Sequence, residues 1–277
     1  MKYNFGLIGY PIKHSLSPWI HKQFLERTSL QGSYSIIEIN PDRSFEEAMN
    51  NLRKKQIDGF NVTVPYKEKI MHYLDDMDEQ AKKIGAVNTV LCKDNKWIGY
   101  NTDGIGYVRS LLHKFPSIET GKDNKILLLG AGGAAKGIFH ALVFNEFKNI
   151  TIANRSLDKA ENLIGTNEQA KVITLQEAEQ LVDQFDIIIQ TTSVGMKPRP
   201  EETIISLDRL KENSIVSDIV YQPLLTTFLR QAKSLHSFVH FGHTMLLYQA
   251  QYAFEIWTNK QPNMENLDQE LQNILEG

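Results

Sequence analysis

The sequence predicts an α/β protein with two domains, one of them a Rossmann-type, doubly wound nucleotide-binding domain. Strand-like and helix-like segments alternate along almost the whole chain, which favours parallel sheets covered by helices. The segment KILLLGAGGAAKGIFHALVF, residues 125–144, reads as a buried strand, a glycine turn and a helix. At 277 residues, the chain is long enough for each domain to have its own core.

The first hundred residues alternate in the same way. We expect strands at 4–9, 33–39 and 59–64, with helices at 18–27 and 45–55. The first helix has Ser17 as a candidate N-cap and Pro18 at its first position. The second opens on a capping box, Ser44 with Glu47 three residues later. The segment NTVLCKDNKWIGY predicts a hairpin that turns at Asp94 and Asn95.

A helix from Asp103 leads into the nucleotide-binding region. Its strands are expected at 125–129, 150–153, 171–174, 185–190 and 214–218. A long helix at 243–258 and a tail from Asn263 follow, after the nucleotide-binding strands are used up. We expect them to pack on the first domain. That domain would then be discontinuous, comprising residues 1–102 and 243–277, and the second would span residues 103–242.

The glycine turn carries the first chemical prediction. Gly130, Gly132 and Gly133 let the backbone fold tightly and let a pyrophosphate approach, and the following helix offers free N–H groups to it. Ala135 supplies the small residue needed for helix–strand packing. The motif alone is weak evidence, but its position between an apolar strand and a helix supports a dinucleotide site.

The end of the next strand indicates which dinucleotide is bound. An NAD site usually has Asp or Glu there, whereas this chain has Asn154, Arg155 and Ser156, with Lys159 a turn later. A carboxylate repels a 2′-phosphate and a guanidinium pairs with it, so the sequence favours NADP. The alternative is that Arg155 is simply exposed and Ser156 only caps the next helix.

Composition excludes several function classes. The net charge of −3 gives no electrostatic reason to expect nucleic acid or an anionic membrane as a partner. The single cysteine, Cys92, permits no internal disulfide and suits a reducing cytoplasm. No apolar run is long enough to span a bilayer, and the histidines lack metal-ligand spacing. We expect a cytoplasmic protein without a metal, monomeric or homodimeric, acting on a small molecule.

Three segments of the first domain are polar where the fold alone does not require it. Ser15 and Ser17 stand at a helix start, where hydroxyls and free N–H groups suit a substrate carboxylate; the alternative is that Ser17 is only an N-cap. The strand before Pro65 delivers Asn61 and Thr63 to its carboxyl end.

Lys67 is predicted to begin a helix just beyond Pro65, where its charge opposes the helix dipole, a placement more typical of function than of stability. In the third segment Asn88, Asn101, Thr102 and Asp103 cluster at strand ends. Asp103 is then either a helix N-cap or a carboxylate within reach of Lys67.

Together these motifs resemble the shikimate dehydrogenase family, NADP-dependent enzymes of aromatic amino-acid biosynthesis. The matching segments cover nearly the whole chain and include GYPIxHSLSPxIH, NVTVPYKE, GAVNT, GYNTDGxG, GAGGAA, NRSxxK, TTSVGM, DIVYxPxxT and GxxMLLYQA. NVTVPYKE is specific to the family rather than general to nucleotide binders. The departures are His243 and Thr244, where apolar residues are usual after Gly242, and Lys136-Gly137 in place of an Arg-Ala pair.

The resemblance implies a role for each matching residue. Lys67 and Asp103 would flank the reacting centre, in a cleft between a substrate domain and an NADP domain. The other implied substrate contacts are Ser15 and Ser17 to the carboxylate, Thr63, Asn88 and Gln249 to the ring hydroxyls, and Tyr221. The implied cofactor contacts are Gly130, Ala131, Gly132, Gly133 and Ala134 at the pyrophosphate; Asn154, Arg155, Ser156 and Lys159 at the 2′-phosphate; and Thr192, Ser193, Val220 and Gly242 elsewhere, the last two by the nicotinamide.

The implied reaction is the reversible reduction of 3-dehydroshikimate to shikimate by NADPH. Hydride addition to a carbonyl creates an alkoxide that needs a proton, and a lysine beside a carboxylate can give it. Three alternatives remain: a quinate/shikimate dehydrogenase that tolerates NAD, a non-catalytic NADP sensor, and a folate dehydrogenase. A sensor needs neither Lys67 nor Asp103, and a pteridine site does not call for the serine pair.

Overall fold

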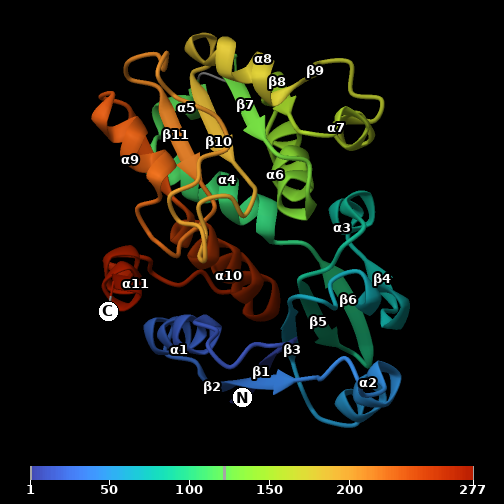
Figure 1. Cartoon of the computed structure of the whole chain (residues 1–277). Coiled ribbons are helices and arrows are strands. Elements are labelled where there is room, and N and C mark those ends of the chain that lie inside the picture. The colour runs from blue at the N-terminus through green and yellow to red at the C-terminus, as the bar shows by residue number, and fades with distance from the viewer. Residues whose placement is uncertain (1, 121–122, 277) are drawn as a thin grey trace. The chain divides into compact units, whose positions relative to one another are not determined.

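The computed structural model describes residues 2–120 and 123–276 and divides the chain into two compact units (Figure 1). The first unit comprises Met1–Gly106 and Leu247–Glu265, and the second comprises Tyr107–Leu246 and Asn266–Gly277.

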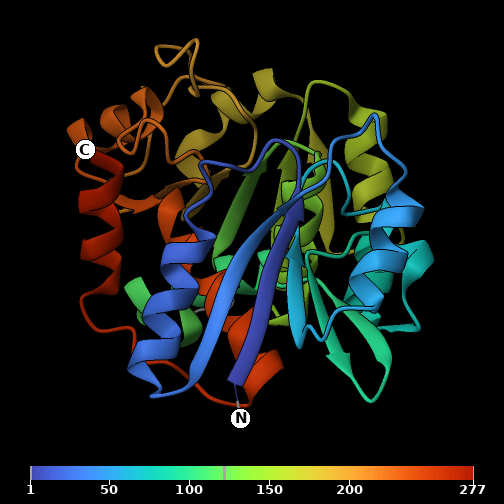
Figure 2. The same ribbon diagram turned by 90° about the horizontal axis from the view of Figure 1, so that it is seen from below.

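The first unit is built on a six-stranded mixed sheet with strand order β2-β1-β3-β5-β6-β4. In chain order the strands are β1 (Lys2–Gly9), β2 (Gln31–Glu38), β3 (Gly59–Val62), β4 (Asp76–Met77), β5 (Thr89–Lys93) and β6 (Lys96–Tyr100). β1 pairs parallel with β2 and β3, and Figure 2 shows β1 and β2 side by side in blue. The predicted hairpin joins β5 to β6 through Asp94 and Asn95, both with positive φ. The pairs β3–β5 and β5–β6 are antiparallel, so in this sheet the expectation of parallel pairing holds only for β1, β2 and β3 and for the pair β4–β6.

Helices and an apolar core complete this unit. They are α1 (Ser17–Arg27), α2 (Phe45–Arg53), the 3₁₀ helix η1 (Lys69–Tyr73) and α3 (Glu79–Ile84). Met49, Phe60 and Val90 are fully buried in one core cluster. Trp257, late in the chain, donates its Nε1–H to the carbonyl of Val90 at 2.9 Å, so residues 247–265 belong to this core.

The second unit contains a six-stranded sheet in which every neighbouring pair is parallel, with strand order β12-β11-β10-β7-β8-β9. This order, read from β9, is that of a dinucleotide-binding fold. The strands are β7 (Lys125–Leu129), β8 (Asn149–Ala153), β9 (Ala170–Ile173), β10 (Ile187–Gln190), β11 (Ile215–Asp218) and β12 (Phe238–Phe241). The predicted Rossmann-type sheet is therefore confirmed.

The remaining helices lie before, between and after the strands of this sheet along the chain. They are α4 (Asp103–Lys114), α5 (Ser117–Thr120), α6 (Gly133–Phe144), α7 (Leu157–Ile164), α8 (Leu175–Gln180), η2 (Val182–Gln184), α9 (Thr227–Ser234), α10 (Gly242–Thr258) and α11 (Leu267–Glu276). Leu127, Val216 and Phe228 are buried in one core cluster of the unit. The unit boundaries fall inside α4 and α10, which each contribute residues to both units.

Two local predictions are corrected. Lys67 lies in a turn and does not begin a helix. The next helical element is the short 3₁₀ helix from Lys69 to Tyr73. The dipole argument for Lys67 therefore fails. Ser17 is not the N-cap of α1: Leu16 holds that position, and no side chain caps the helix.

The division into units also differs from the one drawn from the sequence. The second unit takes the end of the chain, because Leu267 and Leu271 of α11 are fully buried and Asp268 bonds to His243. The predicted boundaries at 102/103 and 242/243 lie four residues before those of the structure, which fall at 106/107 and 246/247.

Candidate active site

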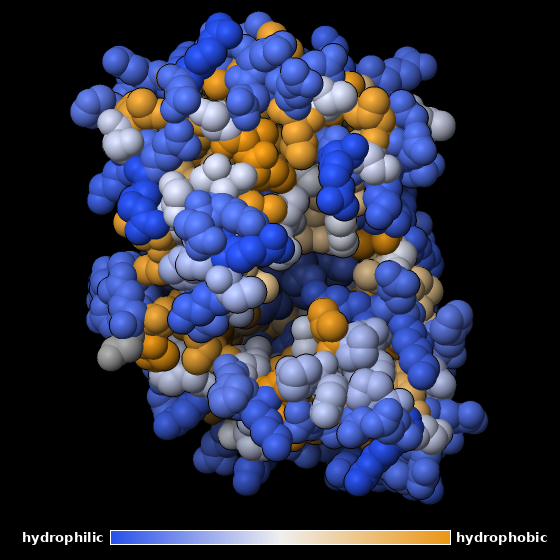
Figure 3. All heavy atoms as spheres, in the orientation of Figure 1, coloured by the Kyte–Doolittle hydropathy of each residue, from blue (hydrophilic) through white to orange (hydrophobic). Residues whose placement is uncertain are grey.

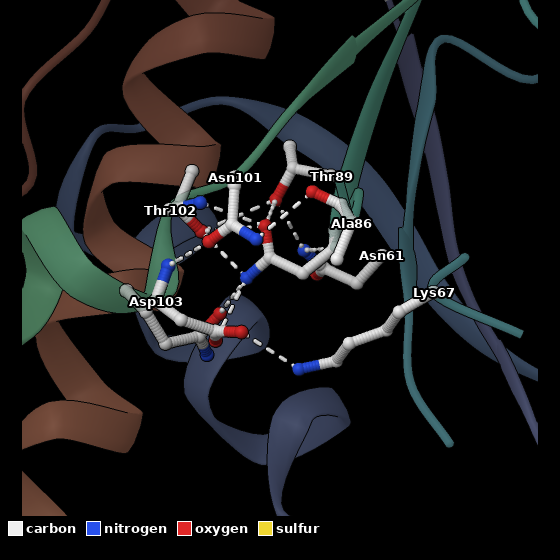
Figure 4. Close-up of polar contacts among 9 residues, drawn as sticks. Asn61, Lys67, Ala86, Thr89, Asn101, Thr102 and Asp103 are labelled. Atoms are coloured by element: carbon white, nitrogen blue, oxygen red, sulfur yellow. Dashed lines mark hydrogen bonds and ion pairs between the residues drawn. The ribbon is translucent and has the colours of Figure 1, made fainter. Parts of the chain in front are cut away.

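Lys67 and Asp103 are paired at the carboxyl end of β3. The Lys67 Nζ lies 2.7 Å from the Asp103 Oδ2, and the two side chains remain 31% and 21% exposed (Figure 4). Asp103 is the first residue of α4, and its carboxylate bonds to Lys67 and Asn88 rather than acting as an N-cap. A partly exposed ion pair contributes little to stability. Asp103 therefore lies within hydrogen-bonding distance of Lys67, as predicted from the sequence, and both side chains are accessible to a ligand.

Amide side chains hold Asp103 from behind. Asn88 donates from Nδ2 to the Asp103 Oδ1 at 2.9 Å, while Asn101 accepts the Asp103 backbone N–H at 3.2 Å. Asn88 also donates to the Gln249 Oε1 at 3.4 Å, which joins α10 to the cluster. Gly106 permits this approach, since a Cβ there would lie 2.4 Å from the Gln249 backbone nitrogen. The carboxylate therefore has one oxygen fixed and one facing Lys67.

Ser15 and Ser17 lie at the start of α1 as expected, although Ser17 is the first residue of the helix and not its N-cap. Ser15 donates its hydroxyl to the Ser17 Oγ at 3.2 Å, and the Ser17 N–H donates to the Ser15 Oγ. Ser17 is the first residue of α1 and Leu16 is its N-cap, so the alternative that Ser17 is only an N-cap is wrong. Thr63 follows β3 and its N–H donates to the carbonyl of Ile8. These three residues belong to the same unit as Lys67.

The glycine turn of the second unit fits a pyrophosphate. Gly130 has φ +112°, and a Cβ there would lie 2.7 Å from the Thr192 Cγ2, so glycine is required. A Cβ on Gly132 or Gly133 would project into space with no atom within 4 Å, which leaves room for a phosphate beside the backbone. α6 begins at Gly133 with no capping side chain, so its first N–H groups are available. Ala131 and Ala134 flank the glycines in this turn.

The end of β8 carries unpaired positive charge. Arg155 and Lys159 are exposed, and within residues 2–120 and 123–276 neither forms a hydrogen bond or an ion pair. Asn154 donates from Nδ2 to the carbonyl of Ser156 at 2.8 Å and so shapes the loop. Ser156 is the N-cap of α7, but its side chain makes no capping bond, so the structure does not support the capping alternative. The four residues fit the 2′-phosphate of NADP.

The remaining predicted cofactor and substrate residues lie at the ends of β10, β11 and β12. Thr192 and Ser193 follow β10, and the Thr192 Oγ1 accepts the N–H of Val194. Val220 and Tyr221 follow β11, and Gly242 follows β12. Burial raises the pKa of Tyr221, so its hydroxyl stays protonated.

Sequence reasoning missed a buried carboxylate at the same strand ends. Asp218 is fully buried, and burial raises its pKa to about 7. It accepts hydrogen bonds from Thr226 Oγ1 at 2.7 Å and from the Val220 N–H at 2.9 Å. Asp218 and Thr226 are the first and last residues of the DIVYxPxxT segment, and this spacing in the sequence could have indicated their contact. Asp218 fixes the loop that carries Val220 and Tyr221.

Other classes of site find no support in the described parts of the chain. Within residues 2–120 and 123–276, no three His, Cys, Asp or Glu side chains gather as metal ligands. No helix in those ranges is long and apolar enough to cross a membrane. Hydrophilic side chains cover most of the face seen in Figure 3. Burial raises the pKa of Cys92 to about 12, which excludes a reactive thiolate there.

Comparison with known proteins decides the family. Three family models match in chain order: a shikimate dehydrogenase substrate binding domain over residues 7–90, a shikimate/quinate 5-dehydrogenase domain over 113–219, and a shikimate 5′-dehydrogenase C-terminal domain over 242–272. A shikimate dehydrogenase (NADP(+)) of Oceanobacillus iheyensis is 55% identical over 278 residues, covering 100% of both chains. The chain belongs to the shikimate dehydrogenase family.

Solved structures of this family share the fold. A shikimate 5-dehydrogenase of Thermus thermophilus in complex with NADP(H) and shikimate matches with a TM-score of 0.85, 30% identity and 99% of each chain covered. One of Listeria monocytogenes in complex with shikimate and NAD matches with a TM-score of 0.87, 34% identity, 98% of this chain and 96% of that chain. The predicted family, fold class and cofactor, NADP, are confirmed.

The departures from the family pattern are accommodated within the second unit. His243 is buried, and its Nε2 lies 2.5 Å from the Asp268 Oδ1 of α11. Thr244 donates its hydroxyl to the carbonyl of Phe241 at 2.7 Å. The His243 Nε2 and the Thr244 hydroxyl therefore have partners, whereas the buried His243 Nδ1 has none among the described residues. Neither change removes a residue of the candidate site.

Proposed function

We propose that Lys67 and Asp103 catalyse proton transfer in the reversible NADPH-dependent reduction of 3-dehydroshikimate to shikimate. The observation that carries the proposal is their 2.7 Å pair, with the second Asp103 oxygen held by Asn88. Bound NADPH supplies the hydride. As the carbonyl carbon gains hydride, the Lys67 ammonium donates a proton to its oxygen, and Asp103 stabilises that ammonium beforehand. In the oxidation of shikimate, Lys67 accepts the hydroxyl proton.

The substrate is bound, in this proposal, by groups of the first unit. Ser15 and Ser17 bind the carboxylate through their hydroxyl groups. The ring hydroxyls bond to Thr63, Asn88, Asp103 and Gln249, with Tyr221 of the second unit as a further contact. The mixed-sheet unit is then the substrate domain. The half-buried cluster supports this proposal, since it combines donors and acceptors at the strand ends where α/β proteins bind ligands.

The cofactor is bound, in this proposal, by the second unit. The pyrophosphate sits on Gly130, Ala131, Gly132, Gly133 and Ala134. Asn154, Arg155, Ser156 and Lys159 bind the 2′-phosphate, and Thr192, Ser193, Val220 and Gly242 complete the site. Supporting this are the space beside Gly132 and Gly133 and the unpaired cations after β8. We also propose a cytoplasmic location, since the lone Cys92 suits a reducing compartment, and a monomer or homodimer.

The deciding experiment is a spectrophotometric assay with shikimate and NADP, comparing the wild type with Lys67→Ala. We expect kcat to fall by roughly 10²–10⁴-fold, the range of a general acid–base group, with a much smaller change in KM. Lys82→Ala is the control, because Lys82 pairs with Glu79 at the surface of the same unit. A near-normal kcat in Lys67→Ala would leave Lys67 as a binding residue only.

A second candidate is a quinate/shikimate dehydrogenase with relaxed cofactor use. Two observations favour testing it: the matching family model includes quinate in its description, and the Listeria monocytogenes relative holds NAD. We expect quinate to be a poor substrate, because its extra tertiary hydroxyl would leave groups unpaired in a site shaped for shikimate. A kcat/KM for quinate within a few-fold of that for shikimate would favour the second candidate.

A further inference from the structure

A chain of buried and partly buried hydrogen bonds runs through the first unit to Asp103, and Figure 4 shows its part from Asn61 onwards. It starts at Tyr34, whose hydroxyl lies 2.7 Å from the Asn61 Oδ1. Asn61 donates from Nδ2 to the Thr89 Oγ1 at 3.0 Å, and Thr89 donates to the Asn88 Oδ1 at 3.0 Å. Asn88 then donates to Asp103 at 2.9 Å. The links come from β2, β3, the start of β5 and the start of α4.

The direction of this chain is fixed by groups that have only one hydrogen-bonding role. The Thr102 backbone N–H can only donate, and it lies 2.8 Å from the Asn88 Oδ1. The Asn88 oxygen therefore faces Thr102 and Thr89, and its NH₂ group faces the Asp103 carboxylate.

The same reasoning orients Asn61. Its Nδ2 lies 3.2 Å from the backbone carbonyl of Asn88, which can only accept. The Asn61 Oδ1 must then accept from Tyr34. Burial raises the pKa of Tyr34, so the phenol keeps the proton that it donates. Every link thus donates towards Asp103, and such an ordered chain strengthens its last bond.

Thr89 is the link on which this order depends. Its side chain is fully buried, and its single hydroxyl accepts from Asn61, donates to Asn88 and lies 3.2 Å from the Thr102 Oγ1. Valine has nearly the same shape without the hydroxyl. Asn61 would then lose an acceptor and Asn88 a donor, both in a buried site where unmet bonds are costly.

We propose that Thr89 is a positioning residue for the reaction: it orders the hydrogen-bond chain that holds the Asp103 carboxylate against Lys67. It contacts neither Lys67 nor Asp103 and acts through Asn88. The proposal rests on the proposed function of Lys67 and Asp103. Its consequence is that the Thr89 hydroxyl contributes to the rate of the chemical step and not to cofactor binding, because the proposed cofactor residues belong to the other unit.

The test is single-turnover hydride transfer from NADPH to 3-dehydroshikimate in Thr89→Val and Thr89→Ser. We expect the rate constant of the valine variant to fall roughly 5- to 50-fold and the serine variant to stay within about threefold of the wild type. The KM for NADP should not change. A loss of folded protein would lower the amplitude of the reaction and leave its rate constant unchanged. Thr258→Val is the control, since Thr258 is a buried threonine whose hydroxyl donates to the Phe254 carbonyl and accepts the Lys260 N–H, both local contacts at the end of α10.

Three outcomes overturn the proposal: an unchanged rate constant in Thr89→Val, a serine variant as slow as the valine variant, or an equal loss in Thr258→Val. If Thr89→Val does not fold, Tyr34→Phe decides, because it removes the first donor of the chain; its rate constant must fall at least about twofold. Lys67→Ala is measured beside them. A slow Lys67→Ala with a normal Thr89→Val rejects only the role of Thr89, whereas a fast Lys67→Ala rejects the proposed function.

Discussion

Replacing Asp103 with asparagine tests the proposed site most directly, because the shape is kept and only the charge and one acceptor are lost. In the folded chain the two Asp103 oxygens accept from two donors, the Lys67 ammonium and the Asn88 NH₂ group. An asparagine at position 103 offers one oxygen and one NH₂ group. Asn88 cannot turn to compensate, since the Thr102 N–H holds its oxygen. One donor must therefore face another donor.

The expected size of the effect follows from these contacts. Loss of the charge-assisted bond to Lys67 is worth about 1.5–3 kcal/mol, and one buried donor left unpaired costs about 1–3 kcal/mol more. If both are felt in the transition state, the barrier rises by about 2.5–6 kcal/mol, which is a fall in kcat of roughly 10²–10⁴-fold. Combined with Lys67→Ala, the loss should be less than additive, because the two side chains act as one pair.

The assay follows reduced nicotinamide at saturating shikimate and NADP, with single-turnover hydride transfer to isolate the chemical step. Asp75→Asn is the matched control: Asp75 also pairs with a cation, Arg53, at 3.1 Å and accepts a backbone N–H, but it makes no contact with Lys67 or Asn88. A kcat for Asp103→Asn within about threefold of that of the control would refute the pairing argument.

Three further predictions concern binding and stability. Arg155→Ala should raise the KM for NADP roughly 10- to 100-fold and leave that for NAD almost unchanged, whereas equal losses would show that Arg155 does not bind the phosphate. Ser17→Ala should weaken shikimate binding without affecting NADP binding; a lower melting temperature with unchanged kinetics would argue against the carboxylate contact. Asp218 has its pKa raised from 3.8 to about 7 by burial, so between these values the folded chain holds a proton that the unfolded chain has lost. The free energy of unfolding should therefore fall as the pH rises through that window, and urea unfolding at about pH 4.5 and about pH 8 should show no such fall in Asp218→Asn.

Strong periodic and turn signals made much of the fold predictable from the sequence. The apolar run before Gly130, the Asp94-Asn95 turn and the helix from Asp103 all appear where expected. Each depends on local chemistry: burial of consecutive branched residues, positive φ at a two-residue turn, and an acidic first helical turn. Short elements with weak periodicity, such as β12 and α9, were missed.

The site was only partly predictable, because its geometry depends on contacts far apart in sequence. Lys67 was assigned to a helix from its neighbours, yet the chain forms a turn there and the side chain reaches a residue 36 positions away. The prediction that Ser17 is an N-cap was also wrong. The helix begins one residue earlier than expected, at Ser17 itself, and the Ser17 N–H donates to the Ser15 Oγ. Tyr34 lies in none of the matching motifs, and Thr89 lies in GAVNT without a role of its own being assigned to it. Their roles become visible only when β2, β3 and β5 are neighbours in one unit.

The two proposed halves of the site are built differently, and this separates what their mutations should change. Asp103 is backed by a buried, directional set of bonds through Asn88, so a small displacement there leaves donors unpaired. Arg155 and Lys159 are exposed and have no hydrogen-bond or ion-pair partner within the described residues, so in the proposed function they become ordered only when the phosphate binds. Preorganised groups contribute mainly to the transition state, whereas groups that order on binding contribute to ground-state affinity. Substitutions of the residues that hold Asp103, such as Thr89, should therefore lower kcat. Substitutions of Arg155 or Lys159 should raise the KM for NADP.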